Sequence, residues 1–251
     1  MTKVILSDVS KSFSKVQAVK DLGLEIEEGE FLTILGPSGC GKTTALRLIL
    51  GALRPDKGDI YFDDELVTNL PLHKRNVGIV YQNYALFPHL TARGNVAFGL
   101  KVRKLPRQEI EAKVKDTFKL LQIEGLEERY PREMSGGQQQ RIALARALIV
   151  EPRLLLLDEP LSNLDARLRA NLRHELRNFQ KWFGITTIYV THDQEEALAI
   201  SDRIAIMNNG ELIQVGKPLD LYFHPKHPFT KEFLGDVIKQ RLSELTSLGL
   251  T

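Results

Sequence analysis

Cysteine and long apolar runs are the scarcest features of this sequence. Its 251 residues include a single cysteine, Cys40, so no intrachain disulfide can form, and this composition fits a reducing compartment. The apolar run at residues 4–6 is far shorter than the roughly 7–15 residues of a signal-peptide core. No stretch approaches the roughly 20 apolar residues that a membrane-spanning helix needs. We therefore expect a cytosolic protein, whose role at any membrane would depend on a partner.

A strong net charge is also lacking. The sequence holds 34 Lys+Arg and 32 Asp+Glu, which leaves a net charge of +2. This balance gives no support to a polyanion-binding function, and no nucleic-acid partner is expected. The hydrophobic fraction of 43% and the charged fraction of 26% are ordinary for globular proteins and exclude long disorder, collagen and coiled coil. One large domain or two small ones would fit this length.

The apolar pattern predicts two strand-rich regions that enclose a helical one. Leu22, Leu24 and Ile26 alternate with polar residues, as in a half-buried strand, and residues 31–35 form a short apolar run typical of a buried strand. From residue 90 to 150 the pattern is helical and charged, with an apolar stripe at Ile110, Val114, Phe118 and Leu121. A first helix is expected at 43–50, and others at 106–121 and 142–150. Further strands are expected at 4–9, 60–62, 65–67, 77–81, 153–157, 186–190, 203–207 and 211–215.

A glycine-rich segment follows the predicted strand 31–35 and fits the pattern G-x-x-x-x-G-K-[ST]. Glycines let backbone N–H groups close around phosphate oxygens, and the positive end of the next helix faces the same anions. Lys42 is suited to reach the β- and γ-phosphates of a nucleotide, and the Thr43 hydroxyl is suited to Mg²⁺. The alternative is an ordinary glycine-rich turn before a helix. The predicted nucleotide-binding residues are Gly36, Pro37, Ser38, Gly39, Cys40, Gly41, Lys42, Thr43 and Thr44.

A second apolar strand ends in two acidic residues. Four leucines at 154–157 place it in the core, and Asp158 emerges at its carboxyl end, where ligands bind in α/β folds. Asp158 is suited to hold Mg²⁺, and Glu159 is placed to polarise a water molecule for attack on the γ-phosphorus. The alternative is a surface acidic pair that caps a turn.

The segment Met134-Ser135-Gly136-Gly137-Gln138 is similar to the L-S-G-G-Q signature of ABC transporter ATPases, and residues 1–235 resemble that family's import ATPases for sugars, polyamines, iron and inorganic anions. Methionine replaces the usual leucine with little change in volume. Ser135 and Gln138 have the spacing of a capping box, which predicts a second anion-binding helix end. The resemblance implies that two copies sandwich two ATP molecules, with Ser135, Gly136, Gly137 and Gln138 facing the partner's nucleotide. Simple helix capping is the alternative for Ser135.

The resemblance assigns further roles to single residues. Gln82 resembles the Q-loop glutamine, which contacts Mg²⁺ and the attacking water, and His192 resembles the switch histidine at the γ-phosphate. Asp165 matches the D-loop, with Asn163 where alanine is common. Phe13 stands where the family stacks an aromatic ring on adenine. Packing into the sheet edge is the alternative for Phe13, and a turn or capping role is the alternative for His192.

The resemblance also implies the architecture and the partners. The expected fold is α/β, a P-loop NTPase core whose mixed sheet is flanked by helices, with an antiparallel β subdomain and an inserted α-helical subdomain. The core covers about 1–85 and 152–235, and the helical subdomain about 86–151. Residues 81–90 resemble the docking region for two integral-membrane permease subunits, although their aromatics could simply pack. A solute-binding protein and a place at the cytoplasmic face of the cell membrane are also implied.

Three readings of function follow from these features. The first is the ATP-hydrolysing subunit of an importer, the second an exporter ATPase, and the third a soluble ABC protein that acts on DNA or ribosomes. Many of these importers continue into a small β-rich regulatory domain, where this sequence has only the amphipathic tail 236–251. Regulation through that domain is therefore expected to be absent.

Three local features carry separate expectations. Cys40 lies near a helix N-terminus and beside Lys42, both of which lower a thiol pKa, so alkylation that MgATP prevents is expected, against the alternative of an unreactive loop residue. The basic segment 101–107 is expected to be a solvated loop. His224 and His227 flank Pro225 and Lys226, which indicates a loop rather than a metal site.

Overall fold

The computed structural model describes residues 2–235, except for the side chain of Arg167. The predicted amphipathic tail 236–251 lies outside the described residues. The chain divides into two compact units, one formed by residues up to Arg75 and from Thr186 onward, and the other by Asn76–Ile185. No helix within residues 2–235 is long and apolar enough to cross a membrane.

The first unit contains an antiparallel sheet with strand order β2-β1-β4-β5. Its strands are β1 (Val4–Phe13), β2 (Val16–Ile26), β4 (Lys57–Phe62) and β5 (Glu65–Leu66). The predicted alternation is confirmed, since Leu22, Leu24 and Ile26 are buried while Asp21 and Glu25 are exposed. The strands predicted at 60–62 and 65–67 are also present, and they pair as an antiparallel hairpin across the Asp63–Asp64 turn.

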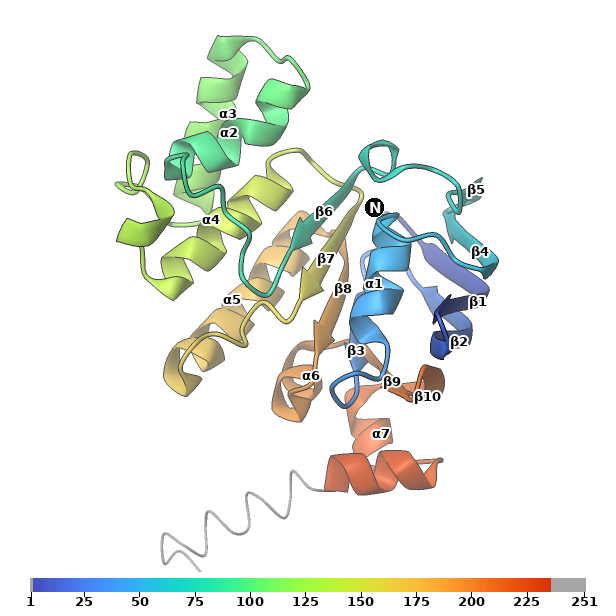
Figure 1. Ribbon diagram of the computed structural model, residues 1–251. Coiled ribbons are helices and arrows are strands. Elements are labelled where there is room, and N and C mark those ends of the chain that lie inside the picture. Colours follow the sequence, from blue (N-terminus) through green and yellow to red (C-terminus); the bar gives the residue numbers. More distant parts are fainter. Residues whose placement is uncertain (1, 236–251) are drawn as a thin grey trace, which may run out of the picture. The chain divides into compact units, whose positions relative to one another are not determined.

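The same unit contains the strands of a mixed sheet, in the order β10-β9-β3-β8. Strand β3 (Phe31–Leu35) runs parallel to β8 (Thr186–Thr191) and β9 (Arg203–Asn208), whereas β10 (Glu211–Gly216) is antiparallel to β9. Blue β3 thus lies between orange strands that come more than 150 residues later (Figure 1). Every residue of β3 is buried, as its apolar run predicted, and every residue of β8 is buried as well.

Three helices of the first unit follow the strands of this sheet. Helix α1 (Lys42–Leu50) follows β3, α6 (Gln194–Ile200) follows β8, and α7 (Pro218–Phe223) follows β10. A 3₁₀ turn spans Leu72–Lys74, and residues 228–235 are helical. Leu35, Ala197, Ile206 and Leu221 share one buried cluster, so α6 and α7 cover the sheet with apolar side chains.

The second unit combines two parallel strands with most of the helices. Strand β6 (Val77–Val80) pairs with β7 (Leu154–Asp158). Between them the chain forms α2 (Ala92–Val102), α3 (Arg107–Leu120), the 3₁₀ turn Pro131–Glu133 and α4 (Gly136–Leu148), drawn in green in Figure 1, and α5 (Ala166–Phe183) follows β7. The predicted stripe at Ile110, Val114, Phe118 and Leu121 is buried. The predicted α/β class, with a mixed sheet, a separate antiparallel sheet and helices, is confirmed.

Some predicted boundaries are wrong. Helix α4 is longer than the apolar stretch 142–150, because the predicted capping box at Ser135 starts it at Gly136. Strand β1 continues to Phe13, held by backbone pairing of its polar end with β2. The segment 101–107 is not all loop, since Lys101 and Val102 form the end of α2 and Arg107 begins α3. Arg103 between them donates to the Val150 carbonyl and to Asn76 Oδ1.

Candidate functional site

The glycine-rich loop connects β3 to α1 and leaves no room for side chains at two of its glycines. A Cβ at Gly36 would lie 2.2 Å from the carbonyl oxygen of Met207 and 2.8 Å from Cys40 Sγ. Gly41 has a φ of 107°, in the left-handed region, and a Cβ there would lie 2.2 Å from the carbonyl oxygen of Ala18. The loop therefore depends on glycine at both ends, as a phosphate-binding loop requires.

Lys42 folds back against this loop. Its side chain is buried, and Nζ donates to the carbonyl oxygens of Gly36 at 2.8 Å and Pro37 at 3.0 Å. Ser38 and Gly39 are exposed at the tip of the loop, and Thr43 and Thr44 lie in the first turn of α1. The ammonium group thus sits where the loop would surround a phosphate.

Cys40 contradicts the expectation of a reactive thiol. Only 3% of the residue is exposed, and Gly36 packs directly over its sulfur. Burial raises the pKa of the Cys40 thiol, and this outweighs the opposite influence of Lys42. The prediction of a lowered pKa is wrong, because the lysine and the helix end were considered without the desolvation. The Cys40 carbonyl accepts from Gly210 N, which ties the loop to the β9–β10 turn.

His192 lies beside the phosphate loop in the first unit. Leu35, the last residue of β3, pairs with Thr191, the last residue of β8. Gly36 and His192 therefore emerge from adjacent parallel strands at the same edge of the sheet. His192 is exposed, and Asp193 after it caps α6 by accepting from Glu196 N at 3.0 Å. The structure brings these two predicted site segments together.

Phe13 is the last residue of β1, and its side chain is 45% exposed. It pairs with Val16, which is 67% exposed, and Lys11 Nζ lies 5.8 Å from the centroid of the Phe13 ring. The ring is therefore not buried in the edge of the antiparallel sheet. An exposed aromatic face of this kind is suited to stack on a planar ligand.

In the second unit, Gln82 and the acidic pair emerge at one edge of the β6–β7 pair. Val80 pairs with Leu157, so the residues just after these positions leave the two parallel strands side by side. Asp158 is 8% exposed at the end of β7, and Gln82 is exposed. Glu159 has a φ of 47°, in the left-handed region, and its carbonyl accepts from Ser162 Oγ at 2.9 Å. This strained turn ends β7 directly after Asp158, so the chain leaves the strand direction at Glu159.

The D-loop lies next to Gln82. Asn163 Nδ2 donates to the Gln82 carbonyl at 2.9 Å. Asp165 caps α5 by accepting from Leu168 N at 3.0 Å. A Cβ at Gly136 of the signature would lie 2.9 Å from Leu164 Cδ2. Gln82, the D-loop and the signature are therefore adjacent within the second unit.

The predicted capping box at the signature is present. Ser135 Oγ accepts from Gln138 N at 3.4 Å, and Gln138 Oε1 accepts from Ser135 N at 3.0 Å. Ser135 is exposed, whereas Gly137 is buried against Leu168 and Leu172. The signature thus presents the positive end of α4 and a serine hydroxyl at the surface of this unit.

Two side chains that sequence reasoning missed hold the segment after Gln82. Asn95 is fully buried in α2 and bonds the backbone of Phe87, Leu90 and Thr91. Arg146 of α4 donates to the carbonyls of Tyr84 and Ala85 at 2.9 and 2.7 Å. The only signal in the sequence was a polar residue at an apolar position of each helix.

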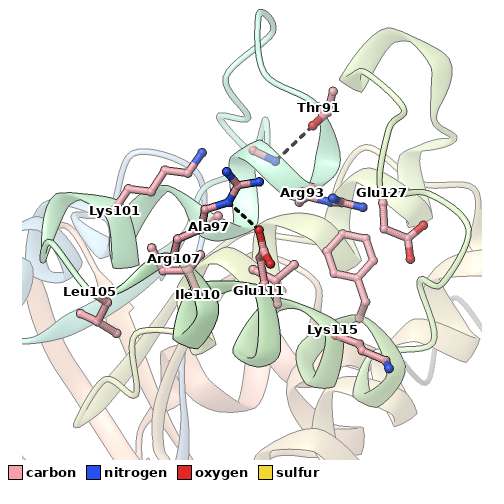
Figure 2. Close-up of a pocket in the computed structure, with 13 residues that line it drawn as sticks. Thr91, Arg93, Ala97, Lys101, Leu105, Arg107, Ile110, Glu111, Lys115 and Glu127 are labelled. Carbon is pink, nitrogen blue, oxygen red and sulfur yellow. Dashed lines mark hydrogen bonds and ion pairs between the residues drawn. The ribbon is translucent and has the colours of Figure 1, made fainter.

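A groove of about 910 Å³ lies between α2 and α3 (Figure 2). Ile110, Val114 and Phe118 form an apolar floor, and Lys101 and Lys115 are exposed on its sides. Arg107 and Glu111, which both belong to α3 and line the groove, form an ion pair at 2.8 Å. None of the predicted nucleotide-binding or catalytic residues lines this groove, which begins at Thr91, directly after the segment 81–90.

Comparisons with known proteins agree with these motifs. A profile described as ABC transporter matches residues 19–162. The chain is 52% identical over 234 residues to the sulfate/thiosulfate import ATP-binding protein CysA of Gloeobacter violaceus, a match that covers 93% of this chain and 68% of that protein. It is 49% identical over 240 residues to the Fe(3+) ions import ATP-binding protein FbpC of Fusobacterium nucleatum, with 95% and 65% covered. The chain thus spans about two thirds of the length of these relatives.

A solved structure is similar as well. The ATP-binding cassette MJ0796, in a dimeric post-hydrolysis state bound to ADP and Pi, superposes with a TM-score of 0.76 at 32% identity. That match covers 86% of this chain and 98% of the other. The chain belongs to the ABC transporter family, as an ABC-type ATPase of the kind that forms the ATP-binding subunit of import systems.

Proposed function

We propose that the chain binds ATP at residues 36–44 and hydrolyses it with Glu159 as general base. The observation that carries this proposal is the buried Lys42 in a loop that only glycine permits, next to His192 on the adjacent strand. Lys42 stabilises the negative charge that grows on the β- and γ-phosphates. Glu159 accepts a proton from the attacking water, Gln82 orients that water, and His192 donates to a γ-phosphate oxygen.

Mg²⁺ fits the donor set proposed for it. Thr43, Gln82 and Asp158 offer oxygen ligands, which this hard cation prefers. Among residues 2–235, no group of three His, Cys, Asp or Glu side chains could form an all-protein metal site. Few protein ligands suit Mg²⁺, because its remaining positions are filled by phosphate oxygens and water. When bound, the ion neutralises charge on the β- and γ-phosphates.

The proposed working unit is a pair of identical chains. The exposed end of α4 at Ser135, Gly136, Gly137 and Gln138 has no lysine of its own, so it is suited to complete the phosphate site of a second copy. Asp165 is the last residue of the D-loop, which contacts both Gln82 and this end of α4, and it is proposed to help couple the two nucleotide sites. The dimer in the similar MJ0796 structure supports this arrangement. Phe13 is proposed to stack on adenine.

We further propose that the chain works beneath two permease subunits at the cytoplasmic face of the membrane, served by a solute-binding protein. Residues 1–235 would act as one ATPase domain with a helical subdomain at 86–151. The segment 81–90 and the groove that follows it form the proposed docking surface, and its apolar floor with basic sides suits an amphipathic helix with acidic ends. Relatives of nearly equal identity are named for sulfate and for iron, so overall identity does not identify the cargo of this chain.

Co-purification tests the transport role. The tagged chain is extracted from native membranes in mild detergent, and its stoichiometric partners are identified by mass spectrometry. The proposal predicts a pair of integral-membrane subunits, lost when Ile110→Asp disrupts the groove but kept in the surface control Glu124→Gln. A partner pair without a solute-binding protein would favour an exporter. Recovery of the chain with nucleic acid or ribosomes would overturn the transport role and leave the ATPase intact.

A further inference from the structure

A buried carboxylate lies in the helix that follows His192. Glu196, in the first turn of α6, is 3% exposed. Its Oε2 accepts two short hydrogen bonds, from Tyr189 Oη at 2.6 Å and from Thr191 Oγ1 at 2.8 Å. Tyr189 is fully buried in β8. Burying a carboxylate is costly unless donors surround it, and these two donors come from β8, the strand that ends directly before His192.

The hydrogen bonds continue on both sides of His192. Thr191 Oγ1 donates to Glu196 and also accepts from Asp193 N at 3.0 Å. Asp193 Oδ1 accepts in turn from Glu196 N at 3.0 Å. The residues before and after His192 are therefore joined to each other and to Glu196. This closed network fixes the backbone on either side of the histidine, while the histidine itself is exposed.

The network also connects to the phosphate loop. Thr191 pairs with Leu35 in the parallel register, and Gly36 begins the loop one residue later. Tyr189 lies against Phe31 of β3, with ring centroids 5.8 Å apart. A shift of the Thr191–Asp193 backbone would therefore change the position of His192 relative to the loop, at the edge where the γ-phosphate is proposed to bind.

We propose that Glu196 is a positioning residue for catalysis, which acts through Thr191 to hold His192 against the phosphate loop. This rests on the proposed role of His192. A carboxylate that served only to fill the core would be equally well replaced by an apolar side chain of similar volume. A positioning carboxylate needs an acceptor oxygen at this point, which glutamine retains and alanine lacks.

The sharpest test compares the two donors of Glu196. Thr191→Val and Tyr189→Phe each remove one hydrogen bond to the same oxygen, but only Thr191 also binds Asp193 N. Thr191→Val is expected to lower kcat roughly 10-fold while KM for ATP changes by less than about 2-fold, and Tyr189→Phe to leave both within about 2-fold. Equal loss in both variants, or no loss in Thr191→Val, would overturn the proposal.

A second comparison uses Glu196 itself and the His192→Ala background. Glu196→Ala is expected to lower kcat about 10- to 100-fold, Glu196→Gln less than about 3-fold, and neither to lower kcat further when His192 is alanine. Thermal unfolding of each variant checks that it is folded. If Glu196→Ala does not fold, the comparison of Glu196→Gln with Thr191→Val tests the proposal instead. A further loss in the His192→Ala background would show that Glu196 acts elsewhere. If His192→Ala alone hydrolyses ATP at the wild-type rate, the proposed role of His192 fails and this inference fails with it.

Discussion

Two helices of this chain begin at glycine-rich segments, and their first turns are completed in different ways. Helix α1 follows Gly41, which has no side chain to accept from the first N–H groups, and Lys42 lies buried against the loop. Helix α4 follows Ser135, whose hydroxyl accepts from Gln138 N. Both helix ends attract anions through the helix dipole, but only α1 adds a positive side chain.

On the proposed function, this difference would give each chain one complete anion site at α1 and one partial site at α4. The 3.4 Å hydrogen bond from Gln138 N to Ser135 Oγ is long for an N–H···O bond, so little energy is lost when the hydroxyl turns to another partner. We therefore expect α1 to determine the affinity of a single chain for ATP. The end of α4 should matter only after two chains have closed on the nucleotide.

The largest expected effect separates binding at these helix ends from turnover. Glu159→Gln removes the proposed base but keeps the shape of the side chain. Turnover should fall on the order of 10³-fold, because a general base contributes about 10²–10⁴-fold, while ATP binding is retained. Phosphate release and nucleotide titration measure the two quantities, with the exposed Glu111→Gln as control. Turnover near the wild-type rate would identify a different base.

A change at α1 should weaken ATP binding itself. Lys42→Ala removes the buried ammonium group, and ATP affinity should fall about 100-fold, since a charge-assisted contact to phosphate is worth roughly 1.5–3 kcal/mol. Titration with a fluorescent ATP analogue measures this loss. Lys101→Ala, which removes an exposed lysine from α2, serves as control. Equal affinities of Lys42→Ala and wild type would mean that the loop is not the nucleotide site.

The matching change at α4 should leave binding intact. Ser135→Ala removes the capping hydroxyl, which stabilises a helix by about 1 kcal/mol. We expect turnover to fall roughly 10-fold while the ATP affinity of the single chain stays constant, because the serine would act on the partner's nucleotide. Ser7→Ala on the exposed side of β1 is the control. If Ser135→Ala lost as much ATP affinity as Lys42→Ala, the two helix ends would not differ in their role.

The smallest expected effect concerns Cys40, a buried residue of the loop that precedes α1. Because folding raises its pKa, the thiolate fraction at neutral pH is lower in the folded chain than in the unfolded chain. Maleimide labelling at pH 7 should be at least about 10-fold slower in buffer than in denaturant, since thiolate is the reactive form and the site is buried. Raising the pH above the ordinary thiol pKa should also lower the free energy of unfolding. Fast labelling of the folded chain at pH 7 would contradict the burial of this side chain.

Local patterns predicted much of the fold. The buried strand β3 has the predicted bounds, since four apolar residues and Thr33 between turns leave little choice, and α3 follows from its apolar stripe. The apolar pattern showed α4 only from residue 142 onward, because Gly136, Gly137 and three glutamines have no apolar period, and its first turn was indicated by the capping box alone. The end of β1 was missed because Ser10, Lys11 and Ser12 are polar and join the sheet through backbone pairing with β2.

The motifs of the site could be identified from fixed residue types and spacing, and not from hydrophobic patterns. Phosphate binding requires glycines and a lysine at fixed spacing, so residues 36–43 could be recognised without any knowledge of their neighbours. Cys40 was misjudged because its pKa depends on burial under Gly36, which arises from tertiary packing. Asn95, Arg146 and Glu196 escaped notice because each acts through backbone groups or side chains that only the fold brings within reach.

The central proposal is that α1 of one copy and α4 of a second copy close on the same ATP, and a mass measurement tests it directly. Light scattering of the Glu159→Gln chain with and without MgATP reports the mass of the particle. The account predicts twice the mass of a single chain with MgATP, and a single-chain mass when Lys42→Ala or Ser135→Arg is added. A single-chain mass for Glu159→Gln at saturating MgATP would contradict dimer closure on ATP. A doubled mass for the Glu159→Gln/Ser135→Arg chain would contradict the role of the α4 end.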